Sequence, residues 1–293
     1  MSKWDKEYID LCKEILESGT RVKNRTGIDT IKIPFKSFVF DLEEEFPILT
    51  TKFVAFKSAV LELLWFYQAQ SNDVRWLTER NVKIWNEWKI DEDGIYRIRD
   101  KENNIKSERY IGREYAHTIG TAYGYIVNKY KLTQELIETL KTDPNSRRMV
   151  MSLWQNEFLP TAALPSCVWN SMWDVTDGKL NAIVTCRSND VPLGLPFNIT
   201  QYAVLVHMIA QVTNLKPGKL YYNAKDMHIY VNQIDGIKEQ IRRYEELGDF
   251  PAPKLYINPN VKDFFEFDNS RELKDIALID YNNHGKIEME VAV

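Results

Sequence analysis

The second half of the chain combines short strand-like runs with one long apolar helix, and this pattern restricts the possible folds more than any other feature. The predicted strands are residues 147–154, 166–175, 179–188 and 218–224. Asp177-Gly178 is a hairpin signal between the middle two strands. Apolar residues from about 197 to 214 predict a helix that Pro196 opens. Because helices and strands mix without regular βαβ alternation, we expect an α+β fold with helices packed on a mixed β-sheet.

The rest of the chain adds helices and a strand, with no stretch that resembles a linker. Helices are expected at residues 4–18, 54–70, 124–141 and 229–247, and a strand at 30–40. Residues 91–116 differ from their surroundings because they are charged and poor in apolar side chains, while compact patterning resumes on both sides. We therefore predict a single domain over residues 1–293, with a surface insertion at about 91–116 whose function the sequence does not indicate.

Composition argues against several classes of protein. The chain carries 38 basic and 42 acidic residues, and a net charge of −4 disfavours binding of nucleic acid through bulk charge. No run approaches the roughly 18 apolar residues that span a bilayer, and the first residues are charged rather than an apolar signal core. The four histidines lack metal-ligand spacing, so no metal is expected. We expect a cytoplasmic protein without membrane or nucleic-acid partners.

Two reactive side chains lie in apolar surroundings. Glu62, within Val60-Leu61-Glu62-Leu63-Leu64-Trp65, is either the polar stripe of its helix or a buried proton relay with a raised pKa. Cys167 is either an inert core thiol or a nucleophile. A nucleophilic thiol needs a nearby cation, and Arg187 at the end of the adjacent predicted strand is the candidate.

Other polar and aromatic pairs also leave two interpretations open. Arg187-Ser188 suits a phosphate group but is equally an ordinary polar turn, and Arg147-Arg148 is either an anion site or a solvated pair. Trp85 and Trp88 either pack in the core or stack on a flat heterocycle.

In this order along the chain, these residues closely resemble the thymidylate synthase family of folate-dependent dUMP methylases. The resemblance runs from about residue 20 to Val293. The matching segments are Arg25-Thr26-Gly27, Pro47-Ile48-Leu49-Thr50-Thr51-Lys52, Glu62-Leu63-Leu64-Trp65-Phe66, Trp85 with Trp88, Gly120 with Tyr123-Gly124, Ser146-Arg147-Arg148, Ala163-Leu164-Pro165 with Cys167, Arg187-Ser188-Asn189-Asp190, Pro196-Phe197-Asn198, Asp226 with His228 and Tyr230, and Val291-Ala292-Val293. Many separated matches in register are far more specific than any single one.

The resemblance implies reductive methylation of dUMP to dTMP, with 5,10-methylenetetrahydrofolate as both carbon donor and reductant and with dihydrofolate released. It implies a homodimer formed through the sheet about a two-fold axis, with active sites shared between subunits. Cys167 would add to C6 of the uracil ring. The other catalytic residues implied are Glu62, Tyr123, Asn198 and Arg187.

The resemblance also assigns binding residues. Those implied for dUMP are Arg25, Arg187, Ser188, Asn198, His228 and Tyr230, with Arg147 and Arg148 reaching over from the partner subunit. Those implied for the folate are Lys52, Ile84, Trp85, Trp88, Leu164, Asp190, Gly194, Phe197 and Ala292. Lys52 would meet the glutamate tail, and Ala292-Val293 would close over the bound pair as a lid.

Three residues, Val168, Met172 and Lys225, depart from the family pattern. Met172 would remove a polar contact from the nucleotide cavity. Because of Met172 and Lys225, a pyrimidine-nucleotide hydroxymethylase, which adds water instead of hydride, is an alternative. A catalytically inactive nucleotide- or RNA-binding regulator is a more distant one. Intact Cys167, Glu62 and the lack of a basic excess disfavour it.

Overall fold

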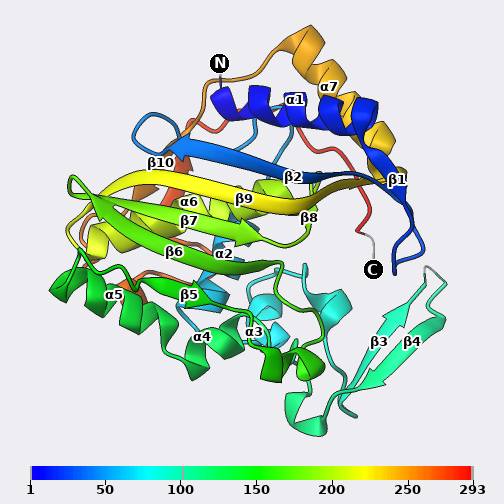
Figure 1. Ribbon diagram of the computed structural model, residues 1–293, viewed down its shortest axis with the longest axis horizontal. Helices are drawn as coiled ribbons and strands as arrows, with labels where there is room; N and C mark the ends of the chain where they lie inside the picture. The colour runs from blue at the N-terminus through cyan, green and yellow to red at the C-terminus, as the bar shows by residue number, and fades with distance from the viewer. Residues whose placement is uncertain (1, 101, 292–293) are drawn as a thin grey trace.

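A mixed sheet of seven strands organises the part of the chain that the computed structural model describes, residues 2–100 and 102–291 (Figure 1). In spatial order the strands are β1 (Thr20–Val22), β2 (Thr30–Asp41), β9 (Lys216–Tyr230), β7 (Lys179–Cys186), β6 (Val168–Thr176) and β5 (Val150–Ser152), and β8 (Asn189–Asp190) also pairs with β9. β7 and β8 run parallel to β9, whereas the other neighbours are antiparallel. The predicted α+β fold with a mixed sheet is therefore confirmed.

The long apolar helix lies in the middle of the molecule. Helix α6 (Gly194–Val212) packs against β9 and β7 on one side and against α2 (Phe56–Tyr67) on the other. A helix that is covered on several sides needs apolar residues around most of its circumference. This position explains why α6 and α2 carry apolar residues around most of their circumference.

The remaining elements surround this centre. The other helices are α1 (Lys3–Ser18), α3 (Val74–Glu79), α4 (Gly124–Lys129), α5 (Leu132–Thr142) and α7 (Ile234–Leu247). Short 3₁₀ helices are Asn86–Trp88, Arg113–Tyr115, Asn156–Thr161, Val231–Gln233 and Phe264–Glu266, and two further strand pairs are β3 (Ile95–Arg99) with β4 (Ile105–Tyr110) and β10 (Lys254–Ile257) with β11 (Ile276–Ile279). Within the described ranges, no helix has the length and apolar character needed to cross a membrane.

Two predicted helices were wrong in extent. The helix expected at 124–141 is divided into α4 and α5, because Lys131 adopts a left-handed conformation with φ 52° that ends the first helix. The helix expected at 229–247 begins only at Ile234, because β9 continues its pairing with β2 as far as Tyr230. Long-range pairing with β2 thus extends β9 well beyond the predicted strand at 218–224.

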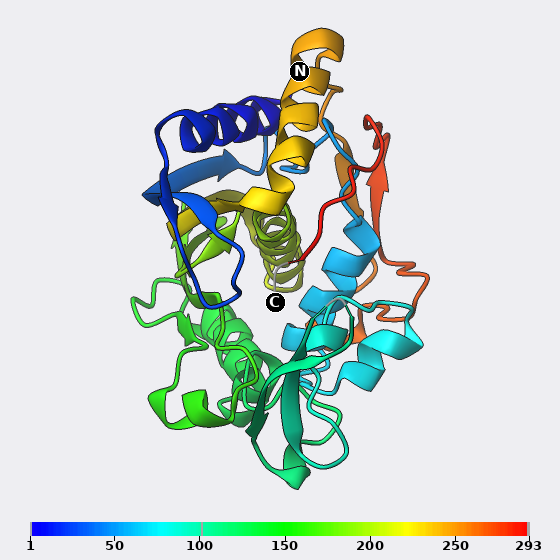
Figure 2. The same ribbon diagram turned by 90° about the vertical axis from the view of Figure 1, so that its right-hand side faces the viewer.

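The charged segment expected as an insertion is an ordered hairpin outside the main sheet. Its strands β3 and β4 pair in antiparallel fashion from Ile95↔Tyr110 onwards. The buried side chains of Tyr96 and Ile111 pack with Ile90 and Ala163 in a small separate apolar cluster. Figure 2 shows this hairpin close to the β1–β2 loop and the C-terminal segment.

The sheet has one face that no element of Figure 1 covers over β6, β7 and β9, with α6 and α2 lying behind it. A row of paired residues crosses this face: Val39, Tyr221, Ile183, Met172 and Val150. Val39 is 50% exposed and Met172 is 40% exposed. Met172 therefore lies on the outer face of the sheet, and the expectation that it borders the nucleotide cavity was wrong.

Candidate active site

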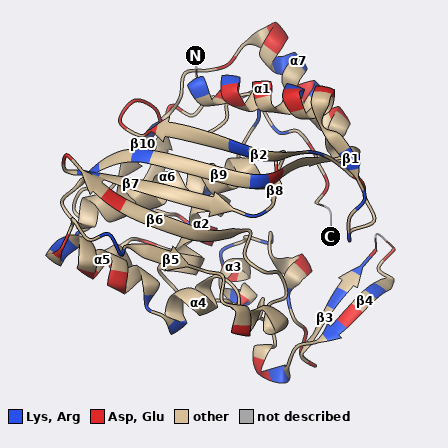
Figure 3. Cartoon of the chain, in the orientation of Figure 1, with Lys and Arg blue, Asp and Glu red and all other residues tan. Residues whose placement is uncertain are grey.

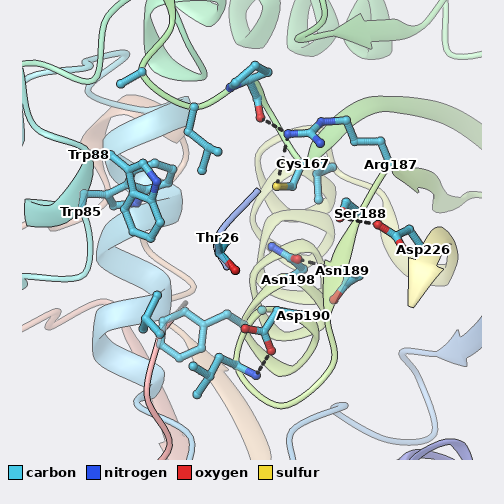
Figure 4. A pocket seen from close by; sticks show the side chains of 18 of the residues that line it. Thr26, Trp85, Trp88, Cys167, Arg187, Ser188, Asn189, Asp190, Asn198 and Asp226 are labelled. Atoms are coloured by element: carbon cyan, nitrogen blue, oxygen red, sulfur yellow. Dashed lines mark hydrogen bonds between the residues drawn. The ribbon is translucent and has the colours of Figure 1, made fainter. Parts of the chain in front are cut away.

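A cavity of about 1000 Å³ opens where β7, β8 and β9 end beside the start of α6. This volume is at the upper end of the range for a site that holds one small molecule. The predicted site residues that line it are Arg25, Glu62, Ile84, Trp85, Trp88, Tyr123, Leu164, Cys167, Arg187, Ser188, Asp190, Gly194, Phe197, Asn198, His228 and Tyr230. Residues that are far apart in the sequence are thus brought to one cavity (Figure 4).

The thiol and the guanidinium lie side by side, as the predicted hairpin required. Cys167 directly precedes β6 and Arg187 directly follows β7, and the Arg187 N–H donates to the Cys167 carbonyl at 2.9 Å. The Cys167 Sγ is 3.8 Å from Arg187 Nη2, which also donates to the Pro165 carbonyl at 2.6 Å. Burial raises the pKa of the Cys167 thiol and Arg187 opposes this rise. The cation therefore offsets part of the burial effect without reversing it.

Tyr123 supports the segment that carries the thiol. Its hydroxyl accepts the Cys167 backbone N–H at 2.8 Å, and its ring stacks on Phe66 with centroids 4.3 Å apart. Tyr123 has φ 45°, a conformation that destabilises a bulky residue by roughly 1–3 kcal/mol. The surrounding contacts hold the ring in this strained position against the cavity.

Glu62 is a buried carboxyl group, so the interpretation as a solvated stripe of its helix was wrong. The indole N–H of Trp85 donates to one carboxylate oxygen, and the amide of Gln201 donates to the other. Burial raises the pKa of Glu62 to about 7, although both hydrogen bonds act in the opposite direction. A carboxyl group with this pKa can both donate and accept a proton near neutral pH.

Asn198 is held by two neighbours that the sequence did not mark as site residues. Its Oδ1 accepts from the Tyr222 hydroxyl at 3.3 Å and from Asn189 Nδ2 at 3.5 Å. Tyr222 and Asn189 are themselves joined by a hydrogen bond of 2.6 Å. Figure 4 shows the amide nitrogen of Asn198 on the side away from Asn189, where it can donate to a ligand.

A second missed group connects the polar residues at the end of β9. Asp226 accepts from the Ser188 hydroxyl at 3.0 Å and forms a 3.0 Å ion pair with Lys32. His228 Nδ1 lies 2.8 Å from the Asp226 carbonyl, and its ring meets Tyr230 edge-on at 5.1 Å. Asp226 thus fixes the positions of Ser188 and His228 from one place on the strand.

The other end of the cavity is aromatic and apolar. Trp85 and Trp88 lie with ring centroids 5.3 Å apart at 61°, and Phe197 lines the same end. Asp190 also lines the cavity, and its carboxylate accepts from the Leu193 backbone N–H at 3.1 Å and from Gln233 Nε2 at 3.3 Å. Burial raises the pKa of Asp190. This end can receive a flat ring that carries N–H donors.

Three predicted residues do not line the cavity, and a fourth falls outside the described part of the chain. Lys52 is buried, its Nζ donates to the Pro192 carbonyl, and burial lowers the pKa of the amine to about 8. Arg147 and Arg148 are exposed before β5 and do not line the cavity of their own subunit. Ala292 lies outside the described residues, although the preceding Val291 lines the cavity.

The hairpin contributes side chains that the sequence did not predict. Tyr96 and Ile98 of β3 and Arg109 of β4 line the cavity, and Arg109 Nη2 donates to the Ala162 carbonyl at 2.5 Å. Alternation of apolar and charged residues in β3 was the available signal, because it gives the hairpin one inward face. The segment therefore forms part of the wall of the site.

The groups at the cavity suit addition of a nucleophile to a polar ring followed by proton transfer. A thiol lies near a guanidinium, a carboxyl group has a pKa near neutrality, and an amide is fixed for recognition of a base. Among residues 2–100 and 102–291, no three His, Cys, Asp or Glu residues are grouped so as to hold a metal ion.

Comparison with known proteins agrees with this geometry. A family model described as Thymidylate synthase matches residues 6–293. Thymidylate synthase from Clostridium beijerinckii is 47% identical over 293 residues and thymidylate synthase 1 from Bacillus subtilis strain 168 is 39% identical over 312, each with 100% of both chains covered. The solved structure of thermostable thymidylate synthase A from Bacillus subtilis has a TM-score of 0.82 at 37% identity, covering 99% of each chain. This chain is therefore a methyltransferase of the thymidylate synthase family.

Proposed function

We propose that the protein converts dUMP to dTMP, with 5,10-methylenetetrahydrofolate as co-substrate and dihydrofolate as second product. The observation that carries the proposal is the Cys167 Sγ, 3.8 Å from Arg187 Nη2, on the same cavity as Glu62 and Asn198. A nucleophile, a proton donor and a base reader must converge on one pyrimidine ring for this reaction.

The nucleotide binds along the polar side of the cavity. Arg25, Arg187 and Ser188 hold the 5′-phosphate, since guanidinium and hydroxyl groups donate to its oxygens. His228 and Tyr230 bond the 3′-hydroxyl of the sugar. Asn198 donates to uracil O4 through its amide nitrogen and accepts N3–H at its Oδ1, where the ligand replaces the long 3.5 Å hydrogen bond from Asn189.

The chain's own residues then carry out addition, protonation and elimination. The Cys167 thiolate adds to C6, the ring electrons move towards O4 and C5 becomes nucleophilic. Glu62 supplies a proton through water to O4, and the Tyr123 hydroxyl assists removal of the C5 proton. The folate, when bound, supplies the methylene carbon and the hydride that complete the methyl group. Expulsion of the thiolate restores the C5–C6 double bond and frees Cys167.

The aromatic end of the cavity fits the folate. Trp85 and Trp88 lie against its pterin, and the buried Asp190 carboxylate accepts pterin N–H groups. The apolar lining completes the cleft with Ile84, Leu164, Gly194 and Phe197. Lys52 reaches the glutamate tail only if its amine leaves the buried contact with Pro192.

A second copy of the chain completes the site through the uncovered face of the sheet. The row from Val39 to Val150 presents half-exposed apolar side chains, as expected of an interface that is buried in a dimer. β6 and β7 carry one charged residue each, Asp174 and Lys179, and Figure 3 shows the few charges along them. Arg147 and Arg148, exposed beside this face, then reach the partner's phosphate site.

The proposal is tested by incubating the purified protein with dUMP and methylenetetrahydrofolate. Dihydrofolate is followed by absorbance and the nucleotide by mass. We expect dTMP and dihydrofolate in equal amounts. Hydroxymethyl-dUMP without dihydrofolate would identify the hydroxymethylase, and absence of any product would identify an inactive binding protein.

Asn198→Asp should move the base preference from dUMP towards dCMP. A carboxylate accepts from the cytosine amino group but cannot donate to uracil O4, so the ratio of kcat/KM for the two nucleotides should change by about 100-fold or more. Steady-state kinetics with both nucleotides measures this. The matched change Asn282→Asp, at an exposed position, should leave the ratio unaltered. An unchanged ratio in Asn198→Asp would show that another residue reads the base.

Mixed dimers of Arg148→Ala and Cys167→Ser subunits should recover activity that neither variant has alone. Each mixed dimer contains one site with both an intact thiol and an intact partner arginine. Random assembly should then give about one quarter of the wild-type activity, since half of the dimers are mixed and each has one working site. The mixture is assayed after unfolding and refolding together. Absence of recovery in mixtures whose hybrid dimers are confirmed by native mass spectrometry would contradict the shared site.

A further inference from the structure

Gln233 is a buried side chain behind the cavity that connects three parts of the site. It is 1% exposed at the end of the 3₁₀ helix Val231–Gln233 and does not line the cavity. Its Nε2 donates to Asp190 Oδ2 at 3.3 Å and to the Glu290 carbonyl at 3.1 Å. Its Oε1 accepts the Tyr230 backbone N–H at 3.2 Å. The amide is therefore bonded through both its nitrogen and its oxygen.

The three partners belong to three different parts of the proposed site. Asp190 borders the folate end and Tyr230 the sugar end, while Glu290 immediately precedes Val291, which lines the cavity. The other Asp190 oxygen already accepts from Leu193 N–H, so Gln233 fixes the second oxygen and with it the plane of the carboxylate. Rotation of that carboxylate requires loss of the Gln233 hydrogen bond.

The C-terminal segment, residues 286–291, packs in a specific position beside Gln233. A Cβ atom added to Gly236 in α7 would lie 2.9 Å from both Cγ and Cε of Met289, so the methionine packs directly on the glycine. Asn232 Nδ2 also lies 3.4 Å from a Glu290 side-chain oxygen. In Figure 2 this red segment runs from the side of α7 towards the middle of the molecule. Side-chain packing and the Gln233 hydrogen bond thus hold adjacent residues of the segment.

We propose that Gln233 is a positioning residue that orients the Asp190 carboxylate for the folate and ties it to the C-terminal segment at Glu290. The inference rests on the proposed function, because it takes Asp190 as a folate ligand. A ligand that holds Asp190 in one orientation favours the hydrogen bonds of the Gln233 amide, and these hydrogen bonds hold the C-terminal segment in place. Because such coupling is reciprocal, the bound segment raises the affinity for the ligand by the same factor. Loss of the amide donor also leaves the Asp190 Oδ2 without this hydrogen bond, so the carboxylate is no longer held in one plane for the folate.

Gln233→Glu is the informative substitution, because it keeps the size and the oxygen that accepts from Tyr230 N–H but replaces the amide donor with a second carboxyl group facing Asp190. The variant should raise KM for the folate by about 10-fold or more while the dUMP dissociation constant changes by less than about 3-fold. Gln134→Glu controls for the change of charge, because Gln134 Nε2 donates to Gln70 Oε1 and has no contact with Asp190 among the hydrogen bonds of the described residues. Equal increases for both ligands, or none, would assign Gln233 a merely structural role.

A second readout does not depend on catalysis. Trypsin can cut after Lys286, which lies exposed in the C-terminal segment, and mass spectrometry measures the rate of that cut. Without ligands, Gln233→Glu and Gly236→Ala should both be cut several-fold faster than wild type, because each removes one of the two contacts that hold the segment. An unchanged rate in Gln233→Glu would overturn the tie to the segment, even in a protein without thymidylate-forming activity. Failure of the proposed function would instead appear as no turnover in wild type.

Discussion

Cys167→Ser should lower dTMP formation by about 10⁴-fold or more while dUMP still binds, because a serine hydroxyl is almost wholly protonated at neutral pH and adds poorly to C6. The substitution keeps the shape of the side chain beside Arg187, which already has its carbonyl partners at Pro165 and Ser166. Binding of the nucleotide therefore does not depend on the sulfur.

Trapping with a fluorinated dUMP analogue and the folate measures this result directly. Wild type should gain the mass of both ligands on the peptide that contains Cys167, and the serine variant should gain none. Cys12→Ser is the matched control, because that thiol lies on the buried side of α1 and burial raises its pKa to about 12. Loss of dUMP binding in Cys167→Ser, measured by calorimetry, would contradict a purely chemical role.

Glu62→Gln should lower kcat by about 10²- to 10⁴-fold, the range for loss of a positioned proton donor. Because burial raises the pKa of Glu62 to about 7, the protonated carboxyl is the donor and wild-type kcat/KM should have a limb that falls as pH rises through about 7. An amide cannot ionise, so this limb should be absent from the variant's pH profile. A limb of the same midpoint in Glu62→Gln would assign the ionisation to another group.

The raised pKa of Glu62 also predicts that the folded protein loses stability as pH rises. The carboxyl is more basic in the folded chain than in the unfolded one, so its ionisation destabilises the fold as pH rises from 4.5 to about 7. The difference of about 2.5 between the two pKa values corresponds to roughly 3 kcal/mol. Relative to Glu62→Gln, the wild-type free energy of unfolding should therefore fall by up to about that amount between pH 5 and pH 8. Denaturant titration at the two pH values measures it.

Features that depend on local pairing could be predicted from the sequence. The Asp177-Gly178 turn sets the register of β6 and β7 from Thr176↔Lys179 to Asn170↔Thr185, which brings Cys167 and Arg187 to the same end of the hairpin. An irregularity between Val168 and Asn170 then shifts the pairing by one residue and places Cys167 beside Arg187. The apolar sequences of α6 and α2 likewise predicted that each helix lies between other elements. The family resemblance supplied the other predicted residues that line the cavity, but not Tyr96, Ile98 and Arg109 of the hairpin.

Features that depend on distant contacts could not be predicted in this way. Lys52 is held away from the cavity lining because Asp5 of α1 accepts the N–H and hydroxyl groups of Thr50 and Thr51, the two residues that precede it. Gln233 looks like one more polar residue after β9 until the C-terminal segment is seen against it. No local periodicity reports such partners, because they are separated by tens or hundreds of residues.

The cavity draws residues from nearly the whole chain, from Val22 to Val291, and this has a consequence for folding. A nascent or clipped chain that lacks the later segments has no complete binding surface, so the nucleotide recognises the finished tertiary structure and not its parts. Binding of the nucleotide therefore stabilises the folded chain against global unfolding. At a nucleotide concentration of 100 times Kd the added stability is about 2.7 kcal/mol, which should slow proteolysis of the protein. Cellular nucleotide supply would in this way regulate the lifetime of the protein as well as its rate of catalysis.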